Sequence, residues 1–191
     1  MSNQVSNLGE KGAATPPSSI LALPMWPRDT VEDLTKYYGK HELGYDGLPT
    51  ERWENSFLTT IATAYPMFYV GSVEPVRIHK ICCNKQVAKS LNAILGDILK
   101  HYGSVEAVHQ ARMDLFGGCY CYRRRRGGHS LSTHAWGAAI DLDPERNQLG
   151  KKYDKTKGMM PEAVIKIFEK YGWTWGGLWK LPDAMHFQAA I

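Results

Sequence analysis

The sequence predicts an α+β fold in a single domain. The chain has 191 residues, a usual size for one domain with a real core. Hydrophobic residues make up 43% and charged residues 22%, as in ordinary soluble globular proteins. Segments with helical periodicity are few, and short stretches of strand character lie between them. This mixture favours a small, mainly antiparallel sheet with flanking helices.

The N-terminal residues 1–23 predict a flexible lead-in, because Gly, Ser, Asn, Thr and Pro dominate and nothing is periodic. No basic region is followed by an apolar core, so this stretch does not resemble a secretory signal peptide. The apolar run 57–70 is interrupted by Pro66 and falls short of a membrane span. We therefore expect synthesis in the cytoplasm without a signal peptide, and no stable membrane insertion. Residues 24–191 form the predicted domain.

Ordered structure is expected to begin at Trp26-Pro27. Asp29 or Thr30 can cap a short helix that Gly39 ends. Residues 40–56 are rich in turn formers, and residues 56–76 mix strand and loop character. The predicted inner side of the first helix consists of Val31, Leu34, Tyr37 and Tyr38.

The clearest helix of the sequence follows Asn84, a good N-cap, and ends at Gly103, which suits a positive φ. A second, shorter helix is expected over 104–110. Gly117-Gly118 predicts a turn, and 119–123 a strand. The apolar positions that recur in the long helix are Val87, Leu91, Ile94, Leu95, Ile98 and Tyr102.

The last third predicts a strand over 140–143, a polar loop over 144–157 and a helix that Pro161 opens at its first position. Gly172 ends this helix, and two short strands follow over 173–175 and 185–187. The inner stripe of the helix consists of Val164, Ile165, Phe168 and Tyr171.

The four cysteines stand as Cys82-Cys83 and as Cys119 and Cys121. Neither pair has the spacer of zinc knuckles or ribbons. Buried or reduced thiols are the expected state. A disulfide between the two pairs after release is the alternative.

The chemistry of the chain concentrates in two stretches. His134 and Asp141 stand seven positions apart, and Asp183 precedes His186 by three. Two imidazoles and one carboxylate are a known ligand set for catalytic Zn²⁺, which keeps a fourth position for water. We expect one Zn²⁺ per chain on His134, Asp141 and His186, with Asp183 as the general base.

Three neighbours of the expected ligands also have predicted roles. Gly137 and Ala138 are expected to keep bulk away from the metal. Strand alternation places Asp143 on the same face as Asp141, as a supporting or structural group.

These residues carry a family resemblance. Ser-x-His-x-x-Gly-x-Ala-x-Asp at 132–141 with Asp-x-x-His at 183–186 resembles zinc D-alanyl-D-alanine carboxypeptidases of the VanY type and phage endolysins that cut L-alanyl-D-glutamate bonds. The similarity extends through 117–123, 126–128 and 175–179. The resemblance implies a Hedgehog/DD-peptidase-like fold, in which residues 24–80 are an accessory segment packed on the catalytic core.

The resemblance also implies roles around the metal. Arg123 and Arg126 fall where the family carries arginines that hold a substrate carboxylate or the oxyanion. Arg124 and Arg125 are expected in a solvated loop. Ser132 has no base partner that would make it a nucleophile. The expected substrate-binding residues are Ser132, His129 and Trp175, whereas His41, His79, His101 and His109 are expected to be core or surface residues.

The resulting hypothesis is a zinc metallopeptidase that hydrolyses stem peptides of bacterial peptidoglycan, as a phage or prophage endolysin. It would act on the wall as a monomer after release, for which a holin-type system is a candidate. The alternatives are a D-alanyl-D-alanine carboxypeptidase or dipeptidase, and a non-catalytic wall-binding or virion protein. The net charge of +4 is weak evidence for an anionic partner, and no nucleic-acid partner is expected.

Overall fold

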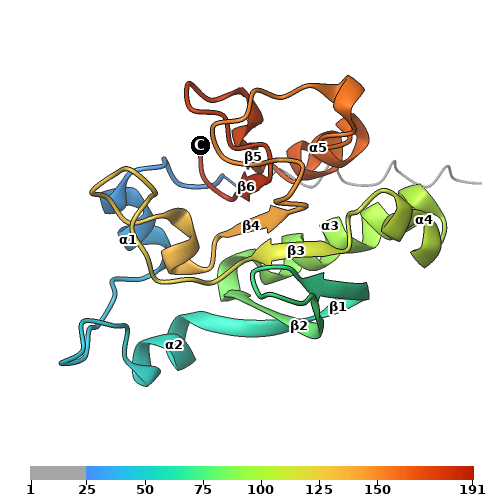
Figure 1. Cartoon of the computed structure of the whole chain (residues 1–191). Coiled ribbons are helices and arrows are strands. Elements are labelled where there is room, and N and C mark those ends of the chain that lie inside the picture. Colours follow the sequence, from blue (N-terminus) through green and yellow to red (C-terminus); the bar gives the residue numbers. More distant parts are fainter. Residues whose placement is uncertain (1–24) are drawn as a thin grey trace, which may run out of the picture.

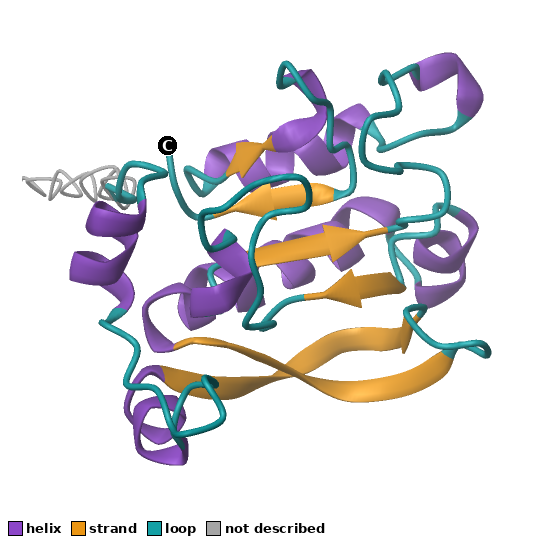
Figure 2. Cartoon of the chain, turned by 60° about the vertical axis from the view of Figure 1, so that its left-hand side comes forward, coloured by secondary structure: helices purple, strands orange, loops and turns teal. Residues whose placement is uncertain are grey.

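A twisted, mixed β-sheet with helices packed against it forms the framework of the protein (Figures 1 and 2). The structure, a computed structural model, describes residues 25–191, so the predicted lead-in 1–23 lies outside the described residues. The predicted α+β class is confirmed. The strands are β1 (Leu58–Tyr69), β2 (Val76–Asn84), β3 (Leu115–Gly118), β4 (Ala139–Leu142), β5 (Thr174–Trp175) and β6 (His186–Gln188). The α-helices are α1 (Val31–Tyr38), α2 (Glu51–Phe57), α3 (Lys85–Tyr102), α4 (Val105–Gln110) and α5 (Glu162–Lys170).

The strand order is β2-β1-β3-β4-β6-β5. All pairings are antiparallel except β1 with β3, where Phe68 lies opposite Leu115. A parallel pair needs a long crossover, and α3 with α4 supplies it. β1 and β2 therefore belong to the same sheet as the short strands β4 and β6.

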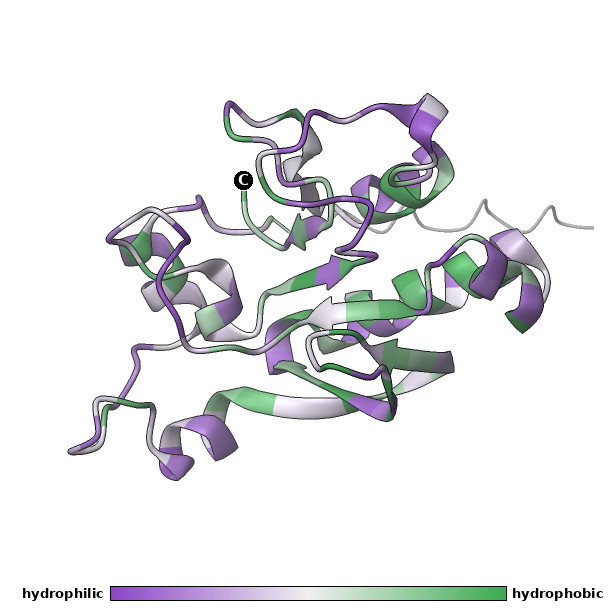
Figure 3. Ribbon diagram, viewed as in Figure 1, coloured by the Kyte–Doolittle hydropathy of each residue, from purple (hydrophilic) through white to green (hydrophobic). Residues whose placement is uncertain are grey.

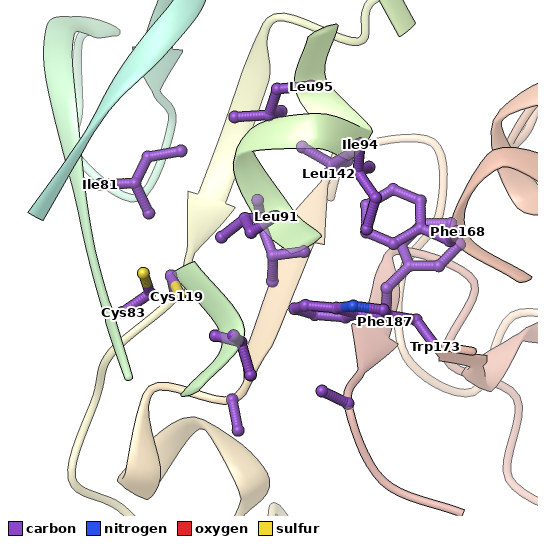
Figure 4. Close-up of a cluster of buried hydrophobic side chains, with 14 of the residues drawn as sticks. Ile81, Cys83, Leu91, Ile94, Leu95, Cys119, Leu142, Phe168, Trp173 and Phe187 are labelled. Carbon is purple, nitrogen blue, oxygen red and sulfur yellow. The ribbon is translucent and has the colours of Figure 1, made fainter. Parts of the chain in front are cut away.

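The helix α3 forms as predicted. The Asn84 side chain accepts a hydrogen bond from the backbone N–H of Gln86, and Gly103 ends the helix at φ 77°. Its apolar stripe packs into the core, where Phe168 and Phe187 stack with ring centroids 3.8 Å apart (Figure 4). Tyr102 is only partly buried. The fully buried members of the stripe are Val87, Leu91, Ile94, Leu95 and Ile98.

The helix α1 is capped by Thr30, whose Oγ1 accepts from the N–H of Asp33, and it ends at Gly39. Leu34 and Tyr38 face the core as predicted, whereas Val31 and Tyr37 are exposed. The buried side of this helix is therefore narrower than predicted.

Two regions before α3 differ from the prediction. Residues 51–57, expected as turns, form α2, where the Thr50 side chain accepts from the N–H of Trp53. Trp53 is its one buried residue, so the helix has little apolar periodicity to reveal it. Residues 56–76, expected to mix strand and loop, contain the 12-residue strand β1 and the loop after it, whereas the strand β2 was not predicted. Figure 2 shows β1 and β2 as the long twisted pair beside the shorter strands.

The predicted turn at Gly117-Gly118 is wrong, because both glycines end β3. Residues 119–123, expected as a strand, lie outside the sheet, although Cys121 N–H donates to the His134 carbonyl at 3.0 Å. A bulge interrupts the β3–β4 pairing at Gly117, where a Cβ would lie 2.9 Å from the Asp141 Cβ. The glycine therefore permits close approach of the two strands.

The helix α5 and the strands β5 and β6 lie within two residues of their predicted positions, whereas two short 3-10 helices, Lys155–Lys157 and Gly176–Leu178, were not predicted. Pro161 is the residue before α5 rather than its first position, and Tyr171 follows the helix. Figure 3 shows the long β4–α5 connection as largely hydrophilic, in contrast to the apolar strands. Among the described helices, none combines the length and apolar character that crossing a membrane requires.

Candidate metal centre

Three neighbouring elements bring His134, Asp141 and His186 together. His134 lies in the short 3-10 helix Thr133–Trp136, and Asp141 in β4. His186 opens β6 and pairs directly with Asp141 across the antiparallel strands. Gly137, at φ 67°, turns the chain between the 3-10 helix and β4. This turn folds His134 back over the two strands.

The donor atoms of the three residues converge. His134 Nε2 lies 3.2 Å from Asp141 Oδ1 and 3.1 Å from His186 Nδ1. The remaining separation, from His186 Nδ1 to Asp141 Oδ1, is 3.0 Å. Within residues 25–191 these side chains form a group able to hold a metal ion. A nitrogen–nitrogen–oxygen donor set with such mutual distances fits Zn²⁺, whose bonds to these atoms measure about 2.0–2.2 Å.

The ring nitrogens that point away from the cluster also have partners. His134 Nδ1 lies 2.7 Å from the Cys119 carbonyl oxygen. His186 Nε2 lies 3.1 Å from Gln188 Oε1. A carbonyl oxygen can only accept, so each of these nitrogens carries the ring proton. The opposite nitrogens are then free to ligate a metal, as in many zinc sites.

The cluster is buried and strongly polar. Burial alone would raise the pKa of Asp141, but His134 and His186 hold it well below its usual range. Burial alone would lower the pKa of His186, but its hydrogen bond and proximity to Asp141 raise it. The carboxylate therefore stays charged and available as a ligand.

Asp183 stands beside the cluster with an unsatisfied carboxyl group. Its backbone N–H donates to the Gly176 carbonyl at 2.9 Å, and its own carbonyl accepts from His186 N–H at 3.1 Å. These bonds fix the backbone, yet the buried Oδ1 has no hydrogen-bond partner among the described residues. Burial raises the pKa of Asp183 to about 6. Such a group is suited to accepting a proton near neutral pH.

The cluster opens into a pocket of about 310 Å³. Asp183 and Ser132 line it, as do the predicted arginines Arg123 and Arg126. His129 is exposed and does not belong to the lining. The complete lining is Arg123, Arg125, Arg126, Ser132, Thr133, Asp141, Leu149, Trp179, Lys180, Leu181, Asp183, Met185, His186 and Gln188.

The structure places Trp175 outside the pocket lining. Its indole is 9% exposed and donates through Nε1 to the Ala184 carbonyl at 2.8 Å. The indole is a packing group here, because it also meets Tyr153 edge-on. Trp179 lines the pocket instead, with its ring centroid 5.4 Å from that of His186.

The arginine run is less solvated than expected. Arg125 donates through two nitrogens to the Asp29 carboxylate, 96 positions earlier in the chain. It therefore ties the pocket wall to the segment before α1. Arg124 donates to the His129 carbonyl and holds the loop closed.

Two predictions about the neighbours of the ligands need correction. A Cβ on Gly137 would lie 2.9 Å from the Asn84 backbone nitrogen, so the glycine makes room for the β2–α3 junction rather than for the metal. Asp143 leaves β4 at φ 44°, and its side chain accepts from Arg112 at 2.9 Å. It is therefore a structural group, one of its two predicted roles, and it does not belong to the pocket lining.

Sequence reasoning missed Gln188 as a partner of His186. Strand alternation could have predicted this contact, because His186 and Gln188 are two positions apart in a strand and such residues share a face. Thr133 and Asp29 were also missed, and no local pattern could have linked Asp29 to the site.

All four cysteines are free thiols in the structure. Burial raises the pKa of Cys83 to about 12 and that of Cys119 well above its ordinary value. Their sulfur atoms lie close together between β2 and the chain after β3 (Figure 4). Cys82 is half-buried and Cys121 is exposed.

Two histidines and one carboxylate are a ligand set found in catalytic zinc sites, and the cluster here is buried beside a second carboxyl group. Residues 126–189 match the model of a protein family described as D-alanyl-D-alanine carboxypeptidase. The match includes all three cluster residues and Asp183, and it supports the superfamily of peptidoglycan metallopeptidases. Searches of curated proteins and of solved structures found no match.

Proposed function

We propose that the protein is a zinc peptidase that hydrolyses peptide bonds in the stem peptides of bacterial peptidoglycan. One observation carries the proposal: three metal-ligand atoms converge beside Asp183, and two of the ligand residues, Asp141 and His186, line the same pocket as Asp183. The family match supports the wall peptide as the substrate class.

His134, Asp141 and His186 would hold the metal. When bound there, Zn²⁺ would lower the pKa of a water molecule and polarise the scissile carbonyl. The protein contributes ligands whose outward nitrogens are already engaged, so little rearrangement is needed.

Asp183 is the proposed general base. Its raised pKa gives the carboxylate more affinity for a proton than an exposed aspartate has. It would take the proton of the attacking water and pass it to the leaving amine nitrogen. Asp183 lines the pocket beside the cluster, which gives its carboxyl group access to a water molecule there.

The basic side of the pocket is proposed to hold the substrate. Arg123, Arg126 and Lys180 line it, and none forms an ion pair with a carboxylate in the described part of the chain. A guanidinium can bind a carboxylate or an oxyanion through two parallel hydrogen bonds. Ser132, also in the lining, can add a hydroxyl contact.

The specific role that we propose is that of a phage or prophage endolysin, which a holin-type system would release to the wall. The description of the matched family favours a second candidate, a D-alanyl-D-alanine carboxypeptidase. The two differ in product. The first cleaves within the stem, whereas the second removes only the terminal D-alanine.

The test is digestion of purified peptidoglycan sacculi by the metal-free protein, the zinc-loaded protein and the protein with added chelator. We expect fragments only with zinc, and mass spectrometry then identifies the bond. Loss of single D-alanine residues would support the second candidate. Failure of the zinc-loaded protein to release any peptide or amino acid would overturn the peptidase proposal. His186→Ala is the control without a complete ligand set.

A further inference from the structure

A buried glutamine contacts the outer side of the metal cluster. Gln188 is 2% exposed and lies two residues after His186 on β6. Its Oε1 atom lies 3.1 Å from His186 Nε2 and 2.9 Å from Thr133 Oγ1. One amide oxygen therefore accepts from a ligand's ring and from a hydroxyl on the neighbouring 3-10 helix.

The His186 ring can form two alternative hydrogen bonds, one from Nε2 to Gln188 and one from Nδ1 to Asp141 inside the cluster. Without a metal, a proton on His186 Nδ1 could be donated to Asp141 Oδ1, only 3.0 Å away. That tautomer would place a proton on the nitrogen that has to ligate. Acceptance by Gln188 Oε1 instead favours the proton on Nε2 and leaves the Nδ1 lone pair facing the cluster.

Thr133 decides which end of the Gln188 amide faces His186. The hydroxyl has one proton and two acceptors in reach, Gln188 Oε1 at 2.9 Å and Asp29 Oδ1 at 3.4 Å. The shorter distance assigns the proton to Gln188. Arg125 strengthens this preference, because its two bonds to the Asp29 carboxylate weaken Asp29 as a competitor for that proton.

We propose that Gln188 is a positioning residue that holds His186 in the tautomer able to bind metal, and that Thr133 holds the Gln188 amide in the required orientation. The inference rests on the metal centre of the proposed function. It does not depend on which peptide bond is cut.

The test measures the tautomer and the metal affinity separately. In metal-free protein with ¹⁵N-labelled histidine, at a pH that keeps the rings neutral, long-range proton–nitrogen NMR should show the His186 proton on Nε2. Gln188→Met, of similar size but without an acceptor oxygen, should move the proton toward Nδ1. Zinc affinity, measured by chelator competition, should fall about 10–100-fold.

Two further variants keep the proposal testable if Gln188→Met does not fold. Gln188→Glu retains an acceptor and should keep the Nε2 proton with zinc affinity near that of the wild type. Thr133→Val removes the hydroxyl donor and should weaken zinc binding several-fold. Gln110→Met on α4, at an exposed position, is the matched control and should change neither readout.

The inference would be overturned if folded Gln188→Met kept the wild-type tautomer and zinc affinity. If that variant does not fold, the same result in Thr133→Val would overturn it. A tautomer shift in a protein that binds no zinc would support the positioning role and count against the proposed function. A third outcome is that the wild type binds zinc and the Gln188→Met variant shows the expected tautomer shift, while the wild type hydrolyses nothing. That result would support the inference and overturn only the proposed peptidase function.

Discussion

At the scale of single residues, the pKa values of two aspartates are shifted in opposite directions. Asp141 belongs to the metal cluster, and Asp183 lies beside it. Asp141 faces two imidazoles, and its pKa is held low. Asp183 has a buried oxygen without a partner, and burial raises its pKa to about 6. One carboxylate is therefore suited to bind a cation and the other to accept a proton.

This division gives a prediction for Asp183→Asn. The variant should bind zinc as the wild type does, because Asp183 is not among the converging ligand atoms. Its hydrolysis rate should fall by about 10²–10⁴-fold, the usual contribution of a general base. Metal content by atomic spectroscopy and release of peptide fragments check the two halves. Retained hydrolysis would disprove the base role, and His134→Ala should lose both properties.

Gly137 gives a prediction about stability. Its φ is +67°, and a Cβ added there would lie 2.9 Å from the Asn84 nitrogen, so a side chain at this position is costly. Gly137→Ala should lower the free energy of unfolding by at least about 1–2 kcal/mol, the cost of the left-handed conformation alone. Denaturant unfolding measures the change.

Gly96 is the matched control for that substitution. It lies exposed within α3, and a Cβ there would meet nothing within 4 Å. Gly96→Ala should raise the free energy of unfolding by about 0.5–1 kcal/mol. Equal effects of the two alanines would contradict the role assigned to Gly137.

At the scale of elements, local signals predicted some segments well. The helix α3 has a cap, an apolar stripe and a C-terminal glycine, and all three act within the segment itself. The helix α2 has a cap but one buried residue, so its formation depends on packing around Trp53. In the strand β3, Gly117 allows the close approach of the neighbouring strand β4, a cause outside the local sequence, and Gly118 adopts a positive φ of 138°.

The junction of α4 with β3 gives a pH prediction. His109 Nδ1 lies 2.6 Å from the Oδ2 atom of buried Asp114, and this hydrogen bond raises the pKa of His109. A raised pKa means that the folded state holds the proton more tightly than the unfolded state. The stabilisation is thus fully present below the ordinary value of 6.5 and is lost as pH rises through the folded pKa.

We expect the difference in unfolding free energy between the wild type and His109→Gln to shrink as pH rises above about 6.5. Comparison with the variant removes contributions of other histidines. Urea unfolding at a series of pH values measures the difference. A difference independent of pH would show that His109 does not act through its charge.

At the scale of the whole molecule, the site joins segments that are far apart in the chain. The convergence of His134, Asp141 and His186 was predictable, because the residues follow a recognisable spacing within 132–141 and 183–186. The pair Arg125–Asp29 spans 96 positions, and only the docking of the segment before α1 brings it together. Asp29 N–H donates to the Ile191 carbonyl, so the two ends of the described chain meet beside the site.

Metal should therefore stabilise the whole fold. The ligands lie on three elements separated by up to 52 positions, and the unfolded chain cannot hold them together. Free zinc at 100 times its Kd should add about 2.7 kcal/mol, which corresponds to a rise in Tm of about 5–10 °C. Calorimetry with zinc and with chelator checks this. His186→Ala should show a much smaller rise in Tm. A wild-type Tm that does not change on addition of zinc would argue against the metal centre.

The position of Trp179 has an optical consequence. Of the six tryptophans, Trp26, Trp53, Trp136, Trp173 and Trp175 are buried, and Trp179 alone is partly exposed. Its fluorescence should form the red-shifted component of the emission. Because its ring lies 5.4 Å from that of His186, a paramagnetic ion such as Cu²⁺ in the cluster should quench this component most strongly. The protein thus carries an intrinsic, label-free reporter of occupancy at the pocket.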